Sequence, residues 1–401
     1  MNASDIRCEN DLALYQKLLE HPDVKRVNQA IERHEAESPN GVRRNLLATS
    51  VRLTAGMAPD IAKMAAECVE LLGVELELEL YVYSSPQFNA ACFKPDGDRL
   101  YVMFSSSLLE GFDQDELRFV MGHELGHHVY DHHAVPIGYL LRGQTRPDPQ
   151  LALELFAWSR YAEISADRAG AHCAQNMDAV AQSLFKLSSG LTSKVVSFSL
   201  DDFVAQVDEM EMGDQSPGQG SSQADWFSTH PFSPLRVKAL KLFEESNLYS
   251  DAAGAVSKQD LEVGVQRVLS LMEPSYLEAK TDTAEAMRRL LFAGLIAVAD
   301  ASDGISEAEL EIFAKFFGKY AFTDKLDLEK IKQTLPQRID DVNERASEPQ
   351  RMQVLHDLCT MSQAEGGVTE AERAELDTIA RGLKIPTSFI CQSLDNIKEL
   401  D

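Results

Sequence analysis

Residues 121–133 read MGHELGHHVYDHH and contain the pentapeptide HELGH at positions 123–127. On a helix, side chains four residues apart lie on one face, so His123 and His127 can hold one metal ion together. Glu124 lies beside them, where a carboxylate can take a proton from a metal-activated water. The pattern therefore predicts a site for one Zn²⁺ per chain, with Glu124 as the catalytic base.

The pentapeptide alone arises by chance, and a catalytic zinc site has three protein ligands and one open position. A second long helix, expected over about 150–174, carries Glu163 and Asp167, again four residues apart. We expect Glu163 to be the third ligand and Asp167 to accept the free ring N–H of a ligand histidine, with His123 as its partner. The alternative is that the two histidines are simply packed and that Glu163 and Asp167 form ordinary salt bridges. It requires the histidine spacing and the carboxylate spacing to occur together by chance.

The other histidines of the opening stretch are not expected to be ligands. The first helix should begin after Asp113, with Glu116 as its capping-box partner, and run to about His132. His128 and His133 also fall near this helix end, where the helix dipole favours a protonated imidazole.

The residues before this helix predict a small sheet. Apolar residues alternate over 74–83, which indicates a half-buried strand. Two further strands are expected at 88–94 and 100–104, joined by the turn sequence PDGD at 95–98 into a hairpin. Residues 11–72 show apolar residues at helical spacing.

Together these segments resemble the HtpX-like and CAAX-prenyl-protease-like zinc metallopeptidases, a gluzincin group. The resemblance covers roughly 40–245 and implies an α+β zincin-type metallopeptidase domain, with helices and a small mixed sheet that has an edge strand. It implies Zn²⁺ held by His123, His127 and Glu163, with Glu124 as base. The matching segments are SSSLLEGFDQDELRFVMGHELGHH (105–128), AEISADRAGA (162–171) and STHPFSPLRVKAL (228–240).

The resemblance also implies roles outside the ligand set. Asn89, Ala90 and Ala91 would belong to the edge strand that pairs with extended substrate, because such a strand offers backbone N–H and C=O groups to a peptide; the alternative for Asn89 is a turn residue. His230 and Arg236 fall where the family carries a THP…R segment. His230 would donate to the oxyanion or close the open zinc position as a fourth ligand; alternatively it only ends a loop, and Arg236 pairs with an acid.

Composition excludes other classes of function. The 401 residues include 38 basic and 64 acidic ones, a formal net charge of -26, which argues against nucleic-acid binding and against a polybasic membrane anchor. The longest apolar run, 290–299, is far shorter than the roughly 20 residues of a membrane-spanning helix. With no signal-peptide pattern and no CxxC pair among six cysteines, we expect a cytoplasmic, bacterial protein with reduced cysteines.

This lack of an apolar span departs from the HtpX-type members of the family, which are embedded in membranes. We therefore expect substrates that are met outside the bilayer, as protein or peptide chains.

Two domains are expected. The zinc metallopeptidase domain would cover 1–280, with a helical N-terminal part at 1–72 and a catalytic core at about 73–247. An all-helical accessory domain would cover 281–401. Residues 213–225, GDQSPGQGSSQAD, form the most linker-like stretch.

The C-terminal region contains a weak internal repeat, ASDGISEAELEIF at 301–313 and AEGGVTEAERAEL at 364–376. Each copy places a hydroxyl residue three positions before a glutamate, which predicts a capping box and a helix–turn–helix corner. The region resembles TerB-like helical domains and would bind a protein partner. The expected capping pairs are Ser306 with Glu309 and Thr369 with Glu372.

The sequence favours a zinc-dependent endopeptidase that hydrolyses peptide bonds of protein substrates. The alternative is a chaperone-like or scaffold protein, with a zinc site that is structural or plugged, or one that acts through the TerB-like domain alone. Glu124 favours the peptidase, because a purely structural zinc site needs no base.

Overall fold

The computed structural model describes the chain except for a set of short segments. The described residues fall into two compact units: the first unit is Met1–Glu209 with Phe227–Val268, and the second unit is Met210–Trp226 with Leu269–Asp401. The domain boundary expected at 280 and most of the linker-like stretch lie outside the described residues. The structure describes residues 2–37, 41–142, 149–192, 196–214, 229–249, 255–272, 282–301, 328–346, 348–362 and 367–398.

The helix that carries HELGH is α7, Gln114–Val129. It begins where the sequence predicted, because the carboxylate of Asp113 accepts hydrogen bonds from the first free N–H groups of the helix, and Glu116 in turn accepts from the N–H of Asp113. This reciprocal capping satisfies donors that have no partner inside the helix.

The predicted end of this helix, near His132, is wrong. Tyr130 closes α7, and Asp131 follows in the left-handed region with φ of 55°. The chain then forms a short 3₁₀ turn, η1, His132–Ala134. His132 therefore does not continue the face of α7, and the turn directs it back toward that helix.

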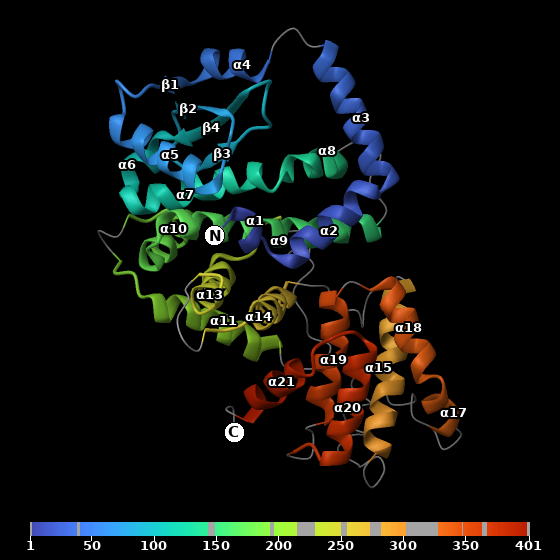
Figure 1. The fold of residues 1–401 in the computed structure, drawn as a ribbon. Helices are drawn as coiled ribbons and strands as arrows, with labels where there is room; N and C mark the ends of the chain where they lie inside the picture. The colour runs from blue at the N-terminus through green and yellow to red at the C-terminus, as the bar shows by residue number, and fades with distance from the viewer. Residues whose placement is uncertain are drawn as a thin grey trace. The chain divides into compact units, whose positions relative to one another are not determined.

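The second long helix is α9, Pro149–Ala174, which runs beside α7 (Figure 1). Small residues allow the two backbones to approach. A Cβ added at Gly122 would lie 2.8 Å from the Cys173 sulfur, and one added at Gly170 would lie 2.6 Å from the Phe119 carbonyl oxygen. Such distances leave no room for a methyl group.

Gly170→Ala is therefore expected to lower the free energy of unfolding by about 1–3 kcal/mol, because the new methyl must displace backbone and ring atoms of Phe119. Chemical denaturation measures the change. Gly138→Ala is the matched control in α8, Ile137–Arg142, since nothing lies within 4 Å of a Cβ added there. Equal unfolding midpoints for the two variants would contradict the close packing of α7 on α9.

The described residues also form a four-stranded sheet of order β1-β2-β4-β3. Strands β2 and β4 are parallel, whereas β1 and β3 pair with their neighbours in antiparallel fashion. The predicted hairpin of β3 and β4 is confirmed, and β2 begins three residues later than the predicted strand. The prediction that 1–72 is helical is wrong at β1, which lies within that part and pairs with β2. The strands are β1 (Val51–Leu53), β2 (Glu77–Tyr83), β3 (Ala90–Cys92) and β4 (Arg99–Ser105).

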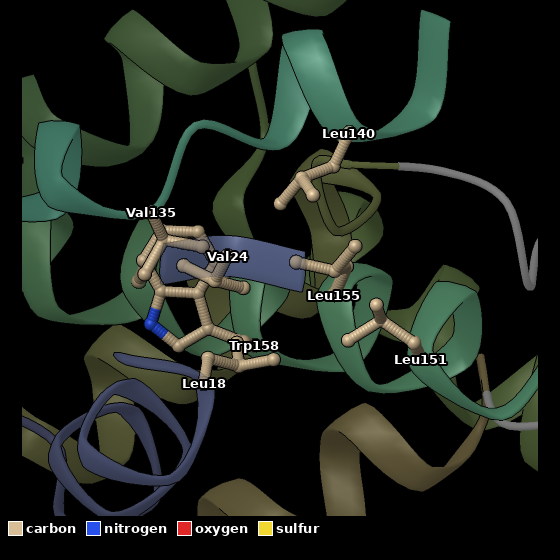
Figure 2. Close-up of a cluster of buried hydrophobic side chains, with 8 residues drawn as sticks. Leu18, Val24, Val135, Leu140, Leu151, Leu155 and Trp158 are labelled. Atoms are coloured by element: carbon tan, nitrogen blue, oxygen red, sulfur yellow. The ribbon is translucent and has the colours of Figure 1, made fainter. Parts of the chain in front are cut away.

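An apolar cluster fixes the N-terminal half of α9. Figure 2 shows Trp158, Leu155 and Leu151 of that helix against Leu18 and Val24 from the N-terminal helices. Burying such side chains contributes about 1.5–3 kcal/mol each. The cluster therefore anchors the N-terminal helices on the helix that carries Glu163.

The remaining helices of the first unit complete its α+β architecture. The N-terminal ones are α1 (Ala3–Ile6), α2 (Glu9–Glu20), α3 (Pro22–Glu37), α4 (Val42–Thr49), α5 (Pro59–Leu72) and α6 (Ser106–Gly111). Those after α9 are α10 (Met177–Ser189), α11 (Leu200–Asp214), α13 (Ser233–Glu244) and α14 (Lys258–Ser270), of which α11 and α14 extend past the unit's bounds.

The second unit is helical wherever it is described. The predicted capping box of Thr369 and Glu372 is confirmed at the start of α20, whereas the first copy of the repeat lies almost entirely outside the described residues. The resemblance to TerB-like domains stays a prediction. The helices are α15 (Asp282–Asp300), α17 (Leu328–Gln333), α18 (Leu335–Arg345), α19 (Glu348–Ser362), α20 (Glu370–Gly382) and α21 (Ser388–Lys398).

Across the described ranges of both units, no helix is long and apolar enough to cross a membrane.

Candidate metal centre

Three predicted ligands come together where α7 faces α9. The Nε2 atoms of His123 and His127 lie 3.2 Å apart. The carboxylate of Glu163 lies 3.6 Å from the first nitrogen and 3.5 Å from the second. Each residue thus offers one donor atom to a group whose atoms all lie within 4.8 Å of one another.

This donor set fits a zinc ion. Ligand atoms about 2.0–2.2 Å from a tetrahedral ion stand roughly 3.3–3.5 Å apart, close to the spacings observed. The buried Oε2 of Glu163 has no hydrogen-bond partner among the described residues. Two imidazole nitrogens at 3.2 Å also require a cation, either a proton or a metal ion, between their lone pairs.

Asp167 lies where the sequence placed it, against the outer nitrogen of His123. Its Oδ1 is 2.9 Å from Nδ1 of His123, and it also accepts two hydrogen bonds from Arg236 of α13 at 2.7 and 2.5 Å. Burial would raise the pKa of Asp167, but Arg236 and His123 hold that pKa below its usual range. The carboxylate therefore keeps the proton of His123 on Nδ1 and leaves Nε2 to face the donor set.

Arg236 and the imidazoles act on the ligand carboxylate as well. The Nη2 of Arg236 lies 3.4 Å from Oε2 of Glu163. Burial would raise the pKa of Glu163, but His230, Arg236 and the two ligand histidines together lower it far below its usual value. Glu163 therefore stays ionised, as a metal ligand must.

Glu124 is held beside this group by the sheet. Its Oε2 accepts a hydrogen bond of 2.7 Å from the backbone N–H of Cys92 in β3. Burial raises the pKa of the Glu124 carboxyl. A raised pKa suits a group that must take up and release a proton near neutral pH.

Strand β3 lies at an edge of the sheet, and its hydrogen bonds to β4 fix which backbone groups face outward. The carbonyl of Asn89 and the N–H of Phe93 bond to β4. By alternation, the backbone groups of Ala90 and Cys92 point away from β4. Of the three residues predicted to meet substrate, only Ala90 therefore directs its backbone to the open edge.

The prediction for the other two residues needs correction. Ala91 faces β4, with Met103 as its register partner. Asn89 lies one residue before β3, and its side-chain amide donates to the hydroxyl of Tyr83 at 3.1 Å. Because its carbonyl accepts from the N–H of Ser105, the backbone of Asn89 also faces β4 and not the open edge.

His230 approaches the same group from the segment before α13. Its Nε2 lies 3.4 Å from Oε1 of Glu163, and its Nδ1 lies 2.9 Å from the hydroxyl of Thr229. The side chain is 64% exposed. This position is compatible with either predicted role, as a donor to an oxyanion or as a fourth ligand.

Comparison with known proteins finds similarity to a peptidase family. Residues 57–145 and 148–244 match the sequence profile of peptidase family M48. The matched residues, which make up less than half of the chain, are similar to the M48 peptidase family. The matched segments contain HELGH, Glu163, Asp167 and the segment from His230 to Arg236.

Three curated relatives carry names in keeping with this family. The chain is 28% identical over 220 residues to plastoglobule-localized metallopeptidase 48 of Arabidopsis thaliana, covering 51% of this chain and 62% of the relative. It is 36% identical over 67 residues to protease HtpX of Shewanella pealeana, 17% of this chain and 23% of the relative. It is 39% identical over 62 residues to protease HtpX of Shewanella loihica, covering 16% of this chain and 21% of the relative.

The chain thus spans less than two thirds of the length of these curated relatives. No solved structure is significantly similar to it.

The carboxylate that contacts His123 can be tested separately from the three predicted ligands. Asp167→Asn is expected to weaken zinc binding by about 10- to 100-fold, because the neutral amide loses the charge that orients and polarises the imidazole. Competition with a zinc chelator measures the dissociation constant. Asp208→Asn, which alters an exposed pair with Lys238, is the matched control. Equal zinc affinity in both variants would contradict the supporting role of Asp167.

One further residue beside the candidate metal centre was missed from the sequence. Nδ1 of His132 lies 2.9 Å from Nδ1 of His127, and Nε2 of His132 lies 3.1 Å from Oδ2 of Asp11. The sequence offered two hints: the clustered histidines, and an aspartate, Asp131, that tolerates the left-handed turn. Neither identifies Asp11.

Proposed function

We propose that the chain is a zinc-dependent metalloendopeptidase that hydrolyses peptide bonds of protein substrates. One observation carries the proposal: a buried carboxylate, Glu124, lies beside a His–His–Glu donor set within the segments that match the M48 profile. The family match supports a metalloprotease at family level, and the donor spacing supports zinc as the ion. A structural zinc site would have no need of Glu124.

In this proposal His123, His127 and Glu163 hold the ion. Zinc bound there would lower the pKa of a water toward neutrality and polarise the substrate carbonyl. Glu124 would accept the water's proton and later deliver it to the leaving amine nitrogen. Its Oε2 is engaged by the N–H of Cys92, which leaves Oε1 for this transfer.

The remaining residues would bind and orient. The backbone of Ala90 would pair with an extended segment of substrate at the open edge of β3. Asp167 and Arg236 would keep His123 in the tautomer that a ligand needs. His230 would stabilise the oxyanion, or close the site as a fourth ligand until substrate displaces it.

The test is hydrolysis of unfolded casein by the purified full chain. We expect turnover that a zinc chelator abolishes and that one equivalent of zinc restores. Binding of casein by the zinc-loaded chain without cleavage would overturn the proposal and favour the chaperone-like alternative.

Two further proposals rest on the sequence alone. Residues 281–401 would form a TerB-like domain that binds a protein partner, and the protein would be cytoplasmic. The capping box at Thr369 supports the repeat. Deleting 281–401 should leave casein hydrolysis largely intact, and loss of hydrolysis without unfolding would contradict an accessory role.

A further inference from the structure

Behind the metal centre lies a chain of hydrogen bonds that runs from His127 through His132 to Asp11. The two histidines face each other through their Nδ1 atoms at 2.9 Å. Such a contact is a hydrogen bond only if one ring nitrogen carries a proton and the other does not. The direction of this bond decides which nitrogen of His127 remains for a metal ion.

Asp11 sets the direction. An ionised carboxylate only accepts hydrogen bonds, so Nε2 of His132, 3.1 Å from Oδ2 of Asp11, must carry a proton. The positive charge that balances Asp11 comes from Arg7, whose guanidinium contacts it at 2.8 and 3.2 Å. In the tautomer with its proton on Nε2, His132 has its lone pair on Nδ1, where the 2.9 Å contact with His127 needs an acceptor.

The proton between the two rings then belongs to His127. Its Nδ1–H donates to Nδ1 of His132, and its Nε2 keeps the lone pair that faces His123 and Glu163. This is the tautomer that a zinc ligand needs. The opposite direction would place a proton on Nε2 of His127 and exclude the metal.

The surroundings of His132 hold it in place. Its side chain is 5% exposed, and its ring packs edge-on against Trp158 at 5.8 Å. The indole N–H of Trp158 donates to Asp11 at 3.1 Å, and the hydroxyl of Ser165 donates to it at 2.7 Å. Trp158 belongs to the apolar cluster of Figure 2, so the carboxylate, the ring and the core form one connected support.

The turn that presents His132 is fixed as well. Asp131 adopts the left-handed conformation, and its carboxylate accepts a hydrogen bond of 2.7 Å from the hydroxyl of Tyr15 in α2. Both Tyr15 and Asp11 lie on α2, which precedes the segments that match the M48 profile. The N-terminal helices therefore reach the metal centre through two contacts.

We propose that Asp11 and His132 are positioning residues for His127, and that they fix its tautomer and ring orientation for metal binding. The inference rests on the proposed function in one respect, since it takes His127 as a zinc ligand. It assigns the N-terminal helices a part in building the metal centre.

Two substitutions of His132 separate positioning from packing, because each keeps one of its two hydrogen bonds. In His132→Asn the amide oxygen stands near the place of Nδ1 and can accept from His127, but the contact with Asp11 is lost. In His132→Gln the amide nitrogen stands near the place of Nε2 and can donate to Asp11, but His127 loses its acceptor. His128→Gln is the control, because His128 is half-buried and lies outside the chain of hydrogen bonds from His127 to Asp11.

Zinc affinity of the full chain, measured by chelator competition, is the first readout. We expect His132→Gln to weaken binding by about 10- to 100-fold, His132→Asn to weaken it clearly less, and the control to leave it unchanged. Equal losses in the Asn and Gln variants would overturn the proposal, because they would indicate a packing role alone. Unchanged affinity in both would overturn it as well.

The second readout needs no metal. Nitrogen-15 spectra of the histidine-labelled, metal-free full chain report which ring nitrogen of His127 is protonated. We expect the proton on Nδ1 in the wild type and in His132→Asn, and a shift toward Nε2 in His132→Gln. A proton on Nε2 of His127 in the wild type would overturn the proposed positioning role of His132 and Asp11. A chain that has the proton on Nδ1 but binds no zinc would contradict only the proposed function.

Discussion

Glu124→Gln is expected to lower kcat for casein-derived peptides by about 10²- to 10⁴-fold, the usual contribution of a general base. Glutamine preserves the size of the side chain, and its amide oxygen can still accept from the N–H of Cys92. It cannot take a proton from water. Because Glu124 is not one of the three donors, zinc content and unfolding midpoint should stay at wild-type values.

Steady-state hydrolysis and zinc analysis on the same preparation provide the measurement. Glu110→Gln, at an exposed position of α6, is the control for the same change of charge. Hydrolysis by Glu124→Gln at the wild-type rate would mean that the activity comes from another protein in the preparation. The role of Glu124 as base would then be rejected.

Glu163→Gln is expected to remove stoichiometric zinc after dialysis. The substitution replaces the anionic ligand with a neutral amide, while Arg236 and the imidazoles that lower its pKa remain in place. The loss in affinity should exceed the roughly 10- to 100-fold that removal of a supporting contact costs. Hydrolysis should be lost together with the metal.

Elemental analysis and chelator competition measure this loss. Glu154→Gln makes the same change on the same helix, at a residue that pairs with Lys17, and should bind zinc as the wild type does. One zinc per chain at unchanged affinity in Glu163→Gln would show that the third ligand is another residue.

The spacing of residues within one helix was enough to predict which side chains of that helix lie together in the candidate metal centre. Spacing of four residues places His123 with His127, and Glu163 with Asp167, whatever the rest of the fold does. The capping box at Asp113 likewise depends only on neighbours in sequence, and the structure shows it. These features required no knowledge of tertiary contacts.

Features that depend on distant contacts were not predicted. Helix α7 ends at Val129 because Asp131 is held in a left-handed turn, and the hydroxyl that holds it comes from Tyr15. The link from His132 to Asp11 joins residues far apart in the chain. Hydrophobic periodicity carries no information about such pairs.

Strand β3, which we propose to pair with substrate, was predicted only in part. The apolar runs and the turn sequence between them predicted the hairpin of β3 and β4. Which residues of β3 bond to β4 is known only from the structure, in which the N–H of Ser105 donates to the carbonyl of Asn89. A shift of one residue reverses which backbone groups face outward. The sequence therefore could not distinguish Ala90 from Ala91.

In the proposed metal centre, one zinc ion is held between α7 and α9 by His123, His127 and Glu163. Anomalous diffraction at the zinc absorption edge, on crystals of the full chain grown without added metal, tests it most directly. We expect one peak per chain, about 2.0–2.2 Å from both Nε2 atoms and from an oxygen of Glu163. Zinc bound elsewhere on the chain, with no peak between the two helices, would contradict it.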